Sequence, residues 1–119
     1  MKTLTIDESK WRCGSDGKVG CALGKGRTLL LNVDGYMCCL GQISLQLGAT
    51  KDQIKWLTNP CDINMVIPPL TVEINSEIVD TELAKNAMGI NDDKFTTVAE
   101  KKKKLTKLFR SKGYRLIFK

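Results

Sequence analysis

The chain has 119 residues, of which 42% are hydrophobic and 27% charged, the size and composition of one globular domain. It contains no histidine, which excludes Cys–His and Ser–His–Asp catalysis and every metal site with an imidazole ligand. The net charge of +6 is unevenly spread, because residues 101–119 carry nine basic and no acidic side chains, whereas residues 1–100 carry 10 basic and 13 acidic ones. This asymmetry indicates an anionic partner for the C-terminal element.

The sequence also predicts the cellular compartment of the protein. No run of 18 apolar residues predicts a transmembrane helix, and the start "MKTLTIDESKW" lacks the apolar centre of a signal peptide. The five cysteines are an odd number and accompany no secretion signal, so we expect reduced thiols. These features predict a cytoplasmic protein that does not engage a membrane.

The first half of the chain predicts one strand and two helices. Alternation over Lys2–Asp7 predicts an opening strand. A helical stripe over Leu40–Leu47 predicts a helix that Gly48 ends. A capping box at Thr50–Gln53 then opens a short helix that reaches Leu57.

The second half predicts two helices and a closing strand. A polar residue at 80 or 81 caps a helix that Gly89 ends, and "INDD" (residues 90–93) reads as a turn. A capping box at Thr97–Glu100 opens an amphipathic helix, and a strand follows at Tyr114–Phe118.

These elements predict an α+β fold with residues 1–119 as a single small domain. We expect a short antiparallel sheet that includes the N- and C-terminal strands and packs with three to four helices.

Two adjacent cysteines are candidate reactive thiols. Cys38 and Cys39 precede the helix predicted near residue 40, and a helix N-terminus lowers the pKa of a thiol. The alternative is that both are small core residues among Met37, Leu40 and Ile43. The absence of a histidine base favours the core interpretation, and the absence of C-x-x-C spacing argues against zinc, so we predict no catalytic residue and no metal site.

A glycine-rich loop, "LGKGRT", carries Lys25 and Arg27. Backbone amides between glycines, with cations nearby, can hold an anion or a nucleotide. The phosphate-binding patterns G-x-x-x-x-G-K-[ST] and G-x-G-x-x-G are both absent, so an ordinary basic surface loop is the alternative, and we predict no cofactor.

The lysine-rich helix is the more informative feature. Lys103, Lys107 and Arg110 are three or four positions apart and line one face, which Lys104 borders. The opposite face is apolar. This pattern is typical of a surface that contacts a phosphate backbone, and equally of a solvated amphipathic helix.

Four segments together resemble a group of small uncharacterised proteins encoded by bacteriophages and prophages, whose pattern includes an "LLN-x-x-G-x-MCCLG" centre. The matching residues are Trp11 with Arg12, Leu30–Gly41, Met88–Asp92 and Leu108–Phe118, in the same order and over most of the chain. The resemblance implies no particular activity.

What the resemblance does imply is a context: an accessory protein that binds a host macromolecule in the cytoplasm of a bacterium, as a host-takeover or anti-defence factor. The partner would be a host protein or a nucleic acid. The alternatives from the residues themselves are nucleic-acid binding through the basic helix and anion or nucleotide binding by the glycine-rich loop.

Overall fold

The structure is a computed structural model that describes residues 2–14, 23–57, 72–74, 77–79 and 81–119. Its elements, in chain order, are β1 (Lys2–Ile6), the 3₁₀ turn η1 (Glu8–Lys10), α1 (Cys39–Gln46), α2 (Lys51–Ile54), β2 (Val72–Ile74), β3 (Glu77–Val79), α3 (Thr81–Asp92), α4 (Val98–Ser111) and β4 (Tyr114–Phe118). The described part of the chain thus combines four helices with two small sheets, in line with the α+β class predicted from the sequence.

The first and last strands, β1 and β4, form the central sheet. They run parallel, in a register that places Leu4 beside Leu116 and Ile6 beside Phe118. The pairing continues beyond β4, where the amide of Lys119 donates to the carbonyl of Ile6 at 2.9 Å. The other two strands, β2 and β3, pair antiparallel with each other.

The antiparallel arrangement that the sequence predicts for the terminal strands is therefore wrong. Helix α4 returns along β4, and Gly113, at φ +87°, reverses the chain between them. As a result β4 starts at the end of the sheet where β1 starts. Alternation of side chains identifies a strand but not its direction, and the long connection between the two strands permits the crossover that a parallel pair requires.

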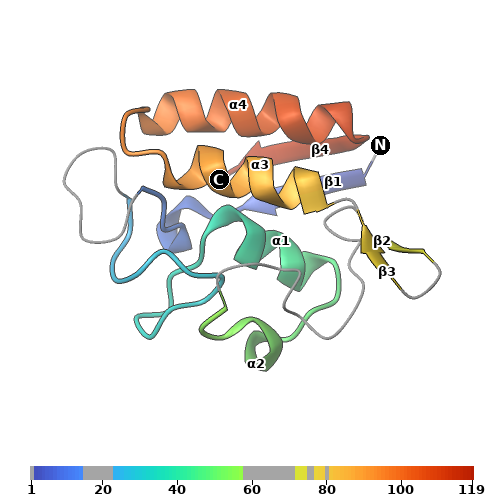
Figure 1. Cartoon of the computed structure of the whole chain (residues 1–119). Coiled ribbons are helices and arrows are strands. Elements are labelled where there is room, and N and C mark those ends of the chain that lie inside the picture. Colours follow the sequence, from blue (N-terminus) through green and yellow to red (C-terminus); the bar gives the residue numbers. More distant parts are fainter. Residues whose placement is uncertain (1, 15–22, 58–71, 75–76, 80) are drawn as a thin grey trace.

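Helices cover one face of this sheet. Leu4, Ile6 and Leu116 point to the buried face, whereas Thr3 and Arg115 on the other face are exposed. Helix α4 packs against β4 and α1 packs against β1, while α3 contacts both of these helices. Figure 1 shows α3 in front of the strands, with α4 above it and α1 below it.

Two glutamines of α1 complete the free edge of β1. Gln46 accepts from the amide of Thr5 at 2.7 Å and donates to its carbonyl, and Gln42 makes the same pair of bonds to Asp7, at 2.7 and 3.0 Å. Their spacing of four residues puts both amides on one side of the helix. The two side chains therefore pair with the backbone of Thr5 and Asp7 as a third strand would, and they cover this part of the edge.

Close packing also explains why α1 contains Gly41. A Cβ atom at this position would lie 1.8 Å from the carbonyl oxygen of Leu30, so any larger residue would push the helix away from the 29–31 segment.

The predicted ends of two helices need correction. Helix α3 does not end at Gly89 but continues to Asp92, because Leu83, Ala87 and Asn91 keep the helical spacing of the buried side. Residues 90–92 are therefore helical, although "INDD" was predicted to be a turn. Helix α2 ends at Ile54, since residues 55–57 instead bond to the extended segment at residues 30–31.

The other predicted elements are present, and their ends agree with the predictions to within one residue. Helix α1 ends before Gly48, which has φ +112°. The capping boxes at Thr50–Gln53 and Thr97–Glu100 are both formed. The cap predicted at residue 80 falls outside the described residues.

Candidate functional site: the basic face of α4

Helix α4 is held in one orientation by both its start and its buried side. The Thr97 hydroxyl accepts from the amide of Glu100 at 3.1 Å, and the Glu100 carboxylate accepts from the amide of Thr97 at 3.2 Å. These hydrogen bonds, that of the backbone first, hold the pKa of Glu100 below its ordinary value. Leu105 and Phe109 are fully buried, so the rotation of the helix about its axis is fixed.

The four consecutive lysines do not form one uniform solvated tract. Lys101 is fully buried, and its ammonium donates to the carbonyl of Asp93 and, at 2.9 Å, to the hydroxyl of Thr96. It therefore fixes the loop that leads into the helix.

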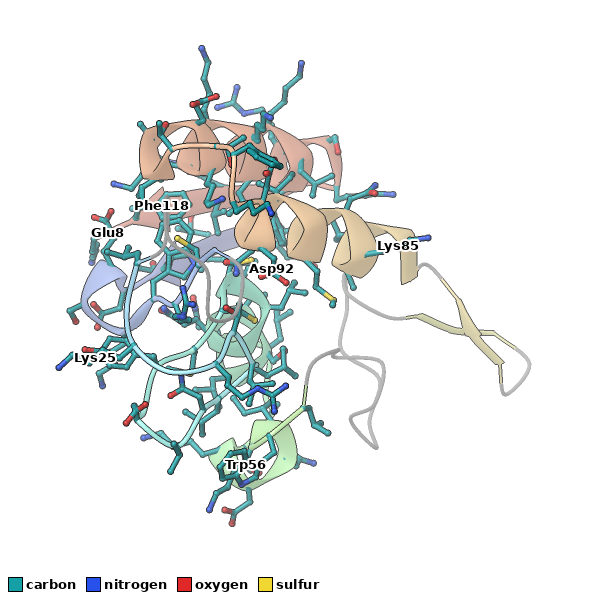
Figure 2. All side chains as sticks on the ribbon, turned by 60° about the vertical axis from the view of Figure 1, so that its left-hand side comes forward. Glu8, Lys25, Trp56, Lys85, Asp92 and Phe118 are labelled. Carbon is teal, nitrogen blue, oxygen red and sulfur yellow. The ribbon has the colours of Figure 1, made fainter. Side chains whose placement is uncertain are left out.

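Lys102, the second lysine of the tract, contacts Glu8 and Phe118. It forms an ion pair with Glu8 and lies 5.7 Å from the centre of the Phe118 ring. This side chain joins α4 to the N-terminal segment and to β4, and Figure 2 shows Glu8 and Phe118 close together beneath that helix.

The remaining cations of α4 are exposed. Lys103, Lys107 and Arg110 line one shallow hollow of about 550 Å³, together with Lys102 and Thr106. The structure thus brings together the three residues that the helical spacing predicted to share a face.

The exposed face of α4 carries only positive charge. Lys104 is exposed but does not line the hollow. Within the described part of the chain, none of the four exposed cations of α4 forms an ion pair, and the one carboxylate of the helix, Glu100, belongs to the capping box. The face therefore presents uncompensated positive charge to solvent.

The second basic site predicted from the sequence lies elsewhere. Lys25 and Arg27 are exposed on a loop, and Figure 2 shows Lys25 well away from α4. The carbonyls of both residues accept from the Asn32 side chain, at 2.6 and 2.8 Å, and that of Gly26 accepts from Arg12. The loop thus turns three carbonyls towards the protein.

The charge around this loop is mixed. A Cβ atom at Gly26 would lie 2.6 Å from the Asp34 carboxylate, which places a negative group directly beside the loop. An anion held at Lys25 and Arg27 would experience this carboxylate as well as the two cations.

The two candidate thiols lie at the start of α1, as predicted, but in an apolar environment. Cys38 is the N-cap residue and is 5% exposed, while Cys39 is fully buried. Burial raises the pKa of Cys38 to about 12 and that of Cys39 well above its ordinary value. Desolvation therefore outweighs the helix dipole, and both groups are neutral thiols at pH 7.

Asn91 is the residue that sequence reasoning missed. Its side-chain oxygen accepts from the Trp11 indole at 2.7 Å and from the Cys39 amide at 3.1 Å. Its side-chain nitrogen donates to the Arg12 carbonyl at 3.2 Å and to the Asp92 carboxylate at 2.8 Å. Asn91 therefore joins α3, the start of α1 and the segment after η1.

The sequence gives only a weak indication that Asn91 is buried. The residue falls on the buried side of α3 once the helix is extended past Gly89, but an asparagine followed by two aspartates is more typical of a turn. Only the tertiary contacts decide between the two readings.

The described residues contain neither a cluster of potential metal ligands nor a membrane-spanning helix. No group of three or more His, Cys, Asp or Glu side chains there is arranged to hold a metal ion. None of the helices there has the length and apolar character needed to cross a membrane.

Comparison with known proteins adds no family. The chain matches no family model, no curated protein and no solved structure.

Proposed function

We propose that this protein is a non-enzymatic binding protein and that the exposed face of α4 contacts an anionic surface of a macromolecule. The observation that carries this proposal is the grouping of Lys103, Lys107 and Arg110 around one hollow, without a carboxylate partner among the described residues. The capping box and the buried side of α4 fix the backbone that carries these cations before any partner arrives, which lowers the entropic cost of binding.

The resemblance of the sequence to phage and prophage proteins supplies the context of the proposal. In that context the partner is a host macromolecule, and the protein acts in the cytoplasm of the bacterial host as a host-takeover or anti-defence factor. The buried, neutral thiols of Cys38 and Cys39 favour binding over a thiol-based reaction.

A nucleic acid is the second candidate partner, and the lysine and arginine composition of the face favours it. Three contacts to phosphates of duplex DNA would give a slope of about −2.7 in a plot of log affinity against log salt concentration. Few aromatic side chains accompany the cations, so contacts would be to the backbone and not to stacked bases.

Capture from a bacterial lysate tests both versions. We expect the tagged protein to retain a partner that the Lys103→Gln, Lys107→Gln, Arg110→Gln variant loses. A protein partner that survives nuclease treatment supports the host-protein version, and nucleic acid that disappears on digestion supports the second. Capture that is unchanged in the variant would refute the role of α4.

A further inference from the structure

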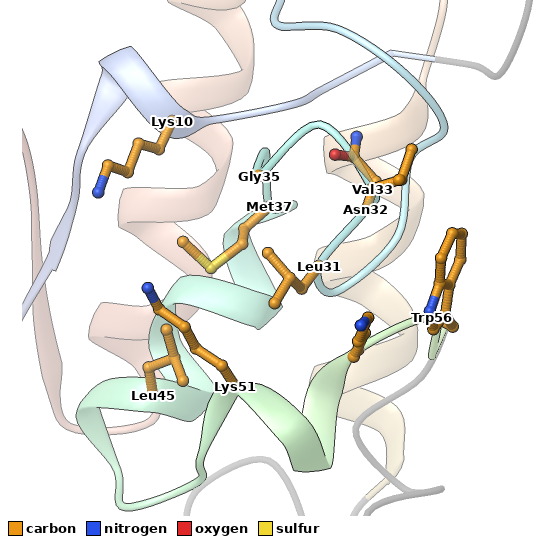
Figure 3. A pocket seen from close by; sticks show the side chains of 10 residues that line it. Lys10, Leu31, Asn32, Val33, Gly35, Met37, Leu45, Lys51 and Trp56 are labelled. Atoms are coloured by element: carbon orange, nitrogen blue, oxygen red, sulfur yellow. The ribbon is translucent and has the colours of Figure 1, made fainter.

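A second hollow, of about 410 Å³, lies on different elements from the α4 face. It is enclosed by η1, the 31–37 segment, the end of α1, and α2 with the two residues that follow it. Figure 3 shows that its lining brings together side chains from segments far apart in the sequence. Its volume is in the range of small-molecule sites.

The lining combines an apolar floor with cations. Leu31, Met37 and Leu45 provide the apolar surface. In Figure 3 the side chains of Lys10 and Lys51 extend along the same side of the hollow.

The charge of this hollow has one sign. Lys55 is its third cation, none of the lining residues is acidic, and none of the three lysines has an ion pair within the described part of the chain. The hollow therefore favours an anion that also carries an apolar body.

Trp56 lies on the side opposite Lys10 and Lys51 in Figure 3, the same side as Val33. The indole is 53% exposed and Val33 73% exposed, whereas most large hydrophobic side chains of the described residues are covered. An exposed aromatic surface at the mouth of a hollow is the kind of group on which a planar ring stacks.

The backbone at Trp56 is strained, which is the second observation. Its φ is +67°, and it is the only non-glycine residue with a positive φ in the described part of the chain. Hydrogen bonds on both sides hold this conformation, from the Trp56 amide to the Leu31 carbonyl at 3.0 Å and from the Leu30 amide to the Leu57 carbonyl at 2.8 Å. The fold thus accepts an unfavourable conformation at the residue that presents the indole, a combination typical of ligand sites.

We infer that this hollow is a nucleotide site. The base stacks on the Trp56 indole next to Val33, the sugar lies over the Leu31 and Met37 floor, and the phosphate meets the ammonium groups of Lys10 and Lys51. One molecule that carries both a planar ring and a phosphate satisfies both sides of the hollow. A ring alone or a phosphate alone satisfies one side only.

This inference differs from the prediction that placed an anion or nucleotide at Lys25 and Arg27. Asn32 links the two regions, because it lines the hollow while its side-chain amide bonds the carbonyls of that loop. The loop therefore supports one wall of the hollow through Asn32, whereas Lys25 and Arg27 themselves do not line the hollow.

The first experiment is a titration of the full chain with AMP, adenosine and inorganic phosphate, followed through tryptophan fluorescence and amide NMR shifts. Trp11 is fully buried, so an added ligand changes the emission of Trp56 selectively. We expect AMP to quench this emission and shift amides of residues 51–57, with weaker effects from adenosine and phosphate. No response to AMP at millimolar concentration, or equal responses to AMP and phosphate, would overturn the inference.

Variants locate the site by calorimetric titration with AMP. Trp56→Asn removes the indole, and asparagine tolerates positive φ, so the fold is retained and affinity falls about 5- to 100-fold. Lys10→Gln with Lys51→Gln also weakens binding, whereas the matched pair Lys103→Gln with Lys107→Gln on α4 does not. An affinity that follows the α4 pair instead would refute the site while leaving the proposed function of α4 intact.

Discussion

Replacing Asn91 with alanine is the sharpest test of how this fold is held together. Alanine keeps the helical backbone of α3 and the bond from the Gly14 amide to the carbonyl of residue 91. It removes all four side-chain hydrogen bonds, and it leaves the Trp11 indole and the Cys39 amide as buried donors without a partner.

The expected loss follows from these two donors. Each buried, unsatisfied donor costs about 1–3 kcal/mol, so we expect the free energy of unfolding to fall by about 4 kcal/mol. For a chain of this length that corresponds to a decrease in Tm of about 15 °C. Both Trp11 and Cys39 are fully buried, so water cannot replace the lost acceptor without opening the core.

Chemical denaturation followed by circular dichroism measures the effect, with Asn86→Ala as the matched control. Asn86 lies on the same helix but is exposed, so its replacement is expected to change stability by less than about 0.5 kcal/mol. If Asn91→Ala unfolded within that margin of the wild type, or if both variants lost equal stability, the proposed role of Asn91 as a link between segments would be wrong.

Three further predictions concern packing, burial and charge. Gly41→Ala should destabilise the protein by about 3 kcal/mol, because the added Cβ would meet a backbone carbonyl. Gly89→Ala on α3 would meet nothing within 4 Å and should stabilise the protein by about 0.5–1 kcal/mol. Denaturant midpoints measure both changes. Folding raises the pKa of Cys38, so the contribution of its protonated thiol to stability is complete below pH 9.0 and is lost as the pH rises towards about 12. The free energy of unfolding should therefore fall by up to about 4 kcal/mol across that range, and it should fall less in Cys38→Ala. Lys101→Ala should cost about 2–3 kcal/mol in the same assay, since it frees the loop before α4, while the exposed Lys103→Ala should remain within about 0.5 kcal/mol of the wild type.

Local signals in the sequence were sufficient for much of the fold. The capping box at Thr97–Glu100 depends on residues three apart, so it could be predicted without knowledge of the tertiary structure. The same is true of the face shared by Lys103, Lys107 and Arg110, because helical spacing alone brings these side chains together.

Features that depend on distant residues could not be predicted in this way. The direction of β4 relative to β1 depends on the path of the whole chain between them. Asn91 bonds to Trp11, 80 residues earlier, and the burial of Lys101 depends on how the loop at residues 93–96 folds beneath it. In the sequence alone, Asn91 fits a solvated turn and Lys101 fits a solvated lysine equally well.

The hollow beside Trp56 was missed for the same reason. Its lining comes from short segments between residues 10 and 56, none of which contains a recognisable ligand-binding motif. The positive φ of Trp56 is a property of the folded chain, because it depends on hydrogen bonds to residues 30 and 31.

The most direct test of the role of α4 is a charge-reversal comparison at equal net charge. One variant carries Lys103→Glu, Lys107→Glu and Arg110→Glu, and the matched control carries Lys25→Glu, Lys85→Glu and Lys94→Glu, which are also exposed positions. Both are compared with the wild type for partner capture from a bacterial lysate, after circular dichroism has shown that both are folded. The account predicts that the α4 variant loses its partner while the control keeps it; equal retention, or equal loss, in the two variants would contradict it.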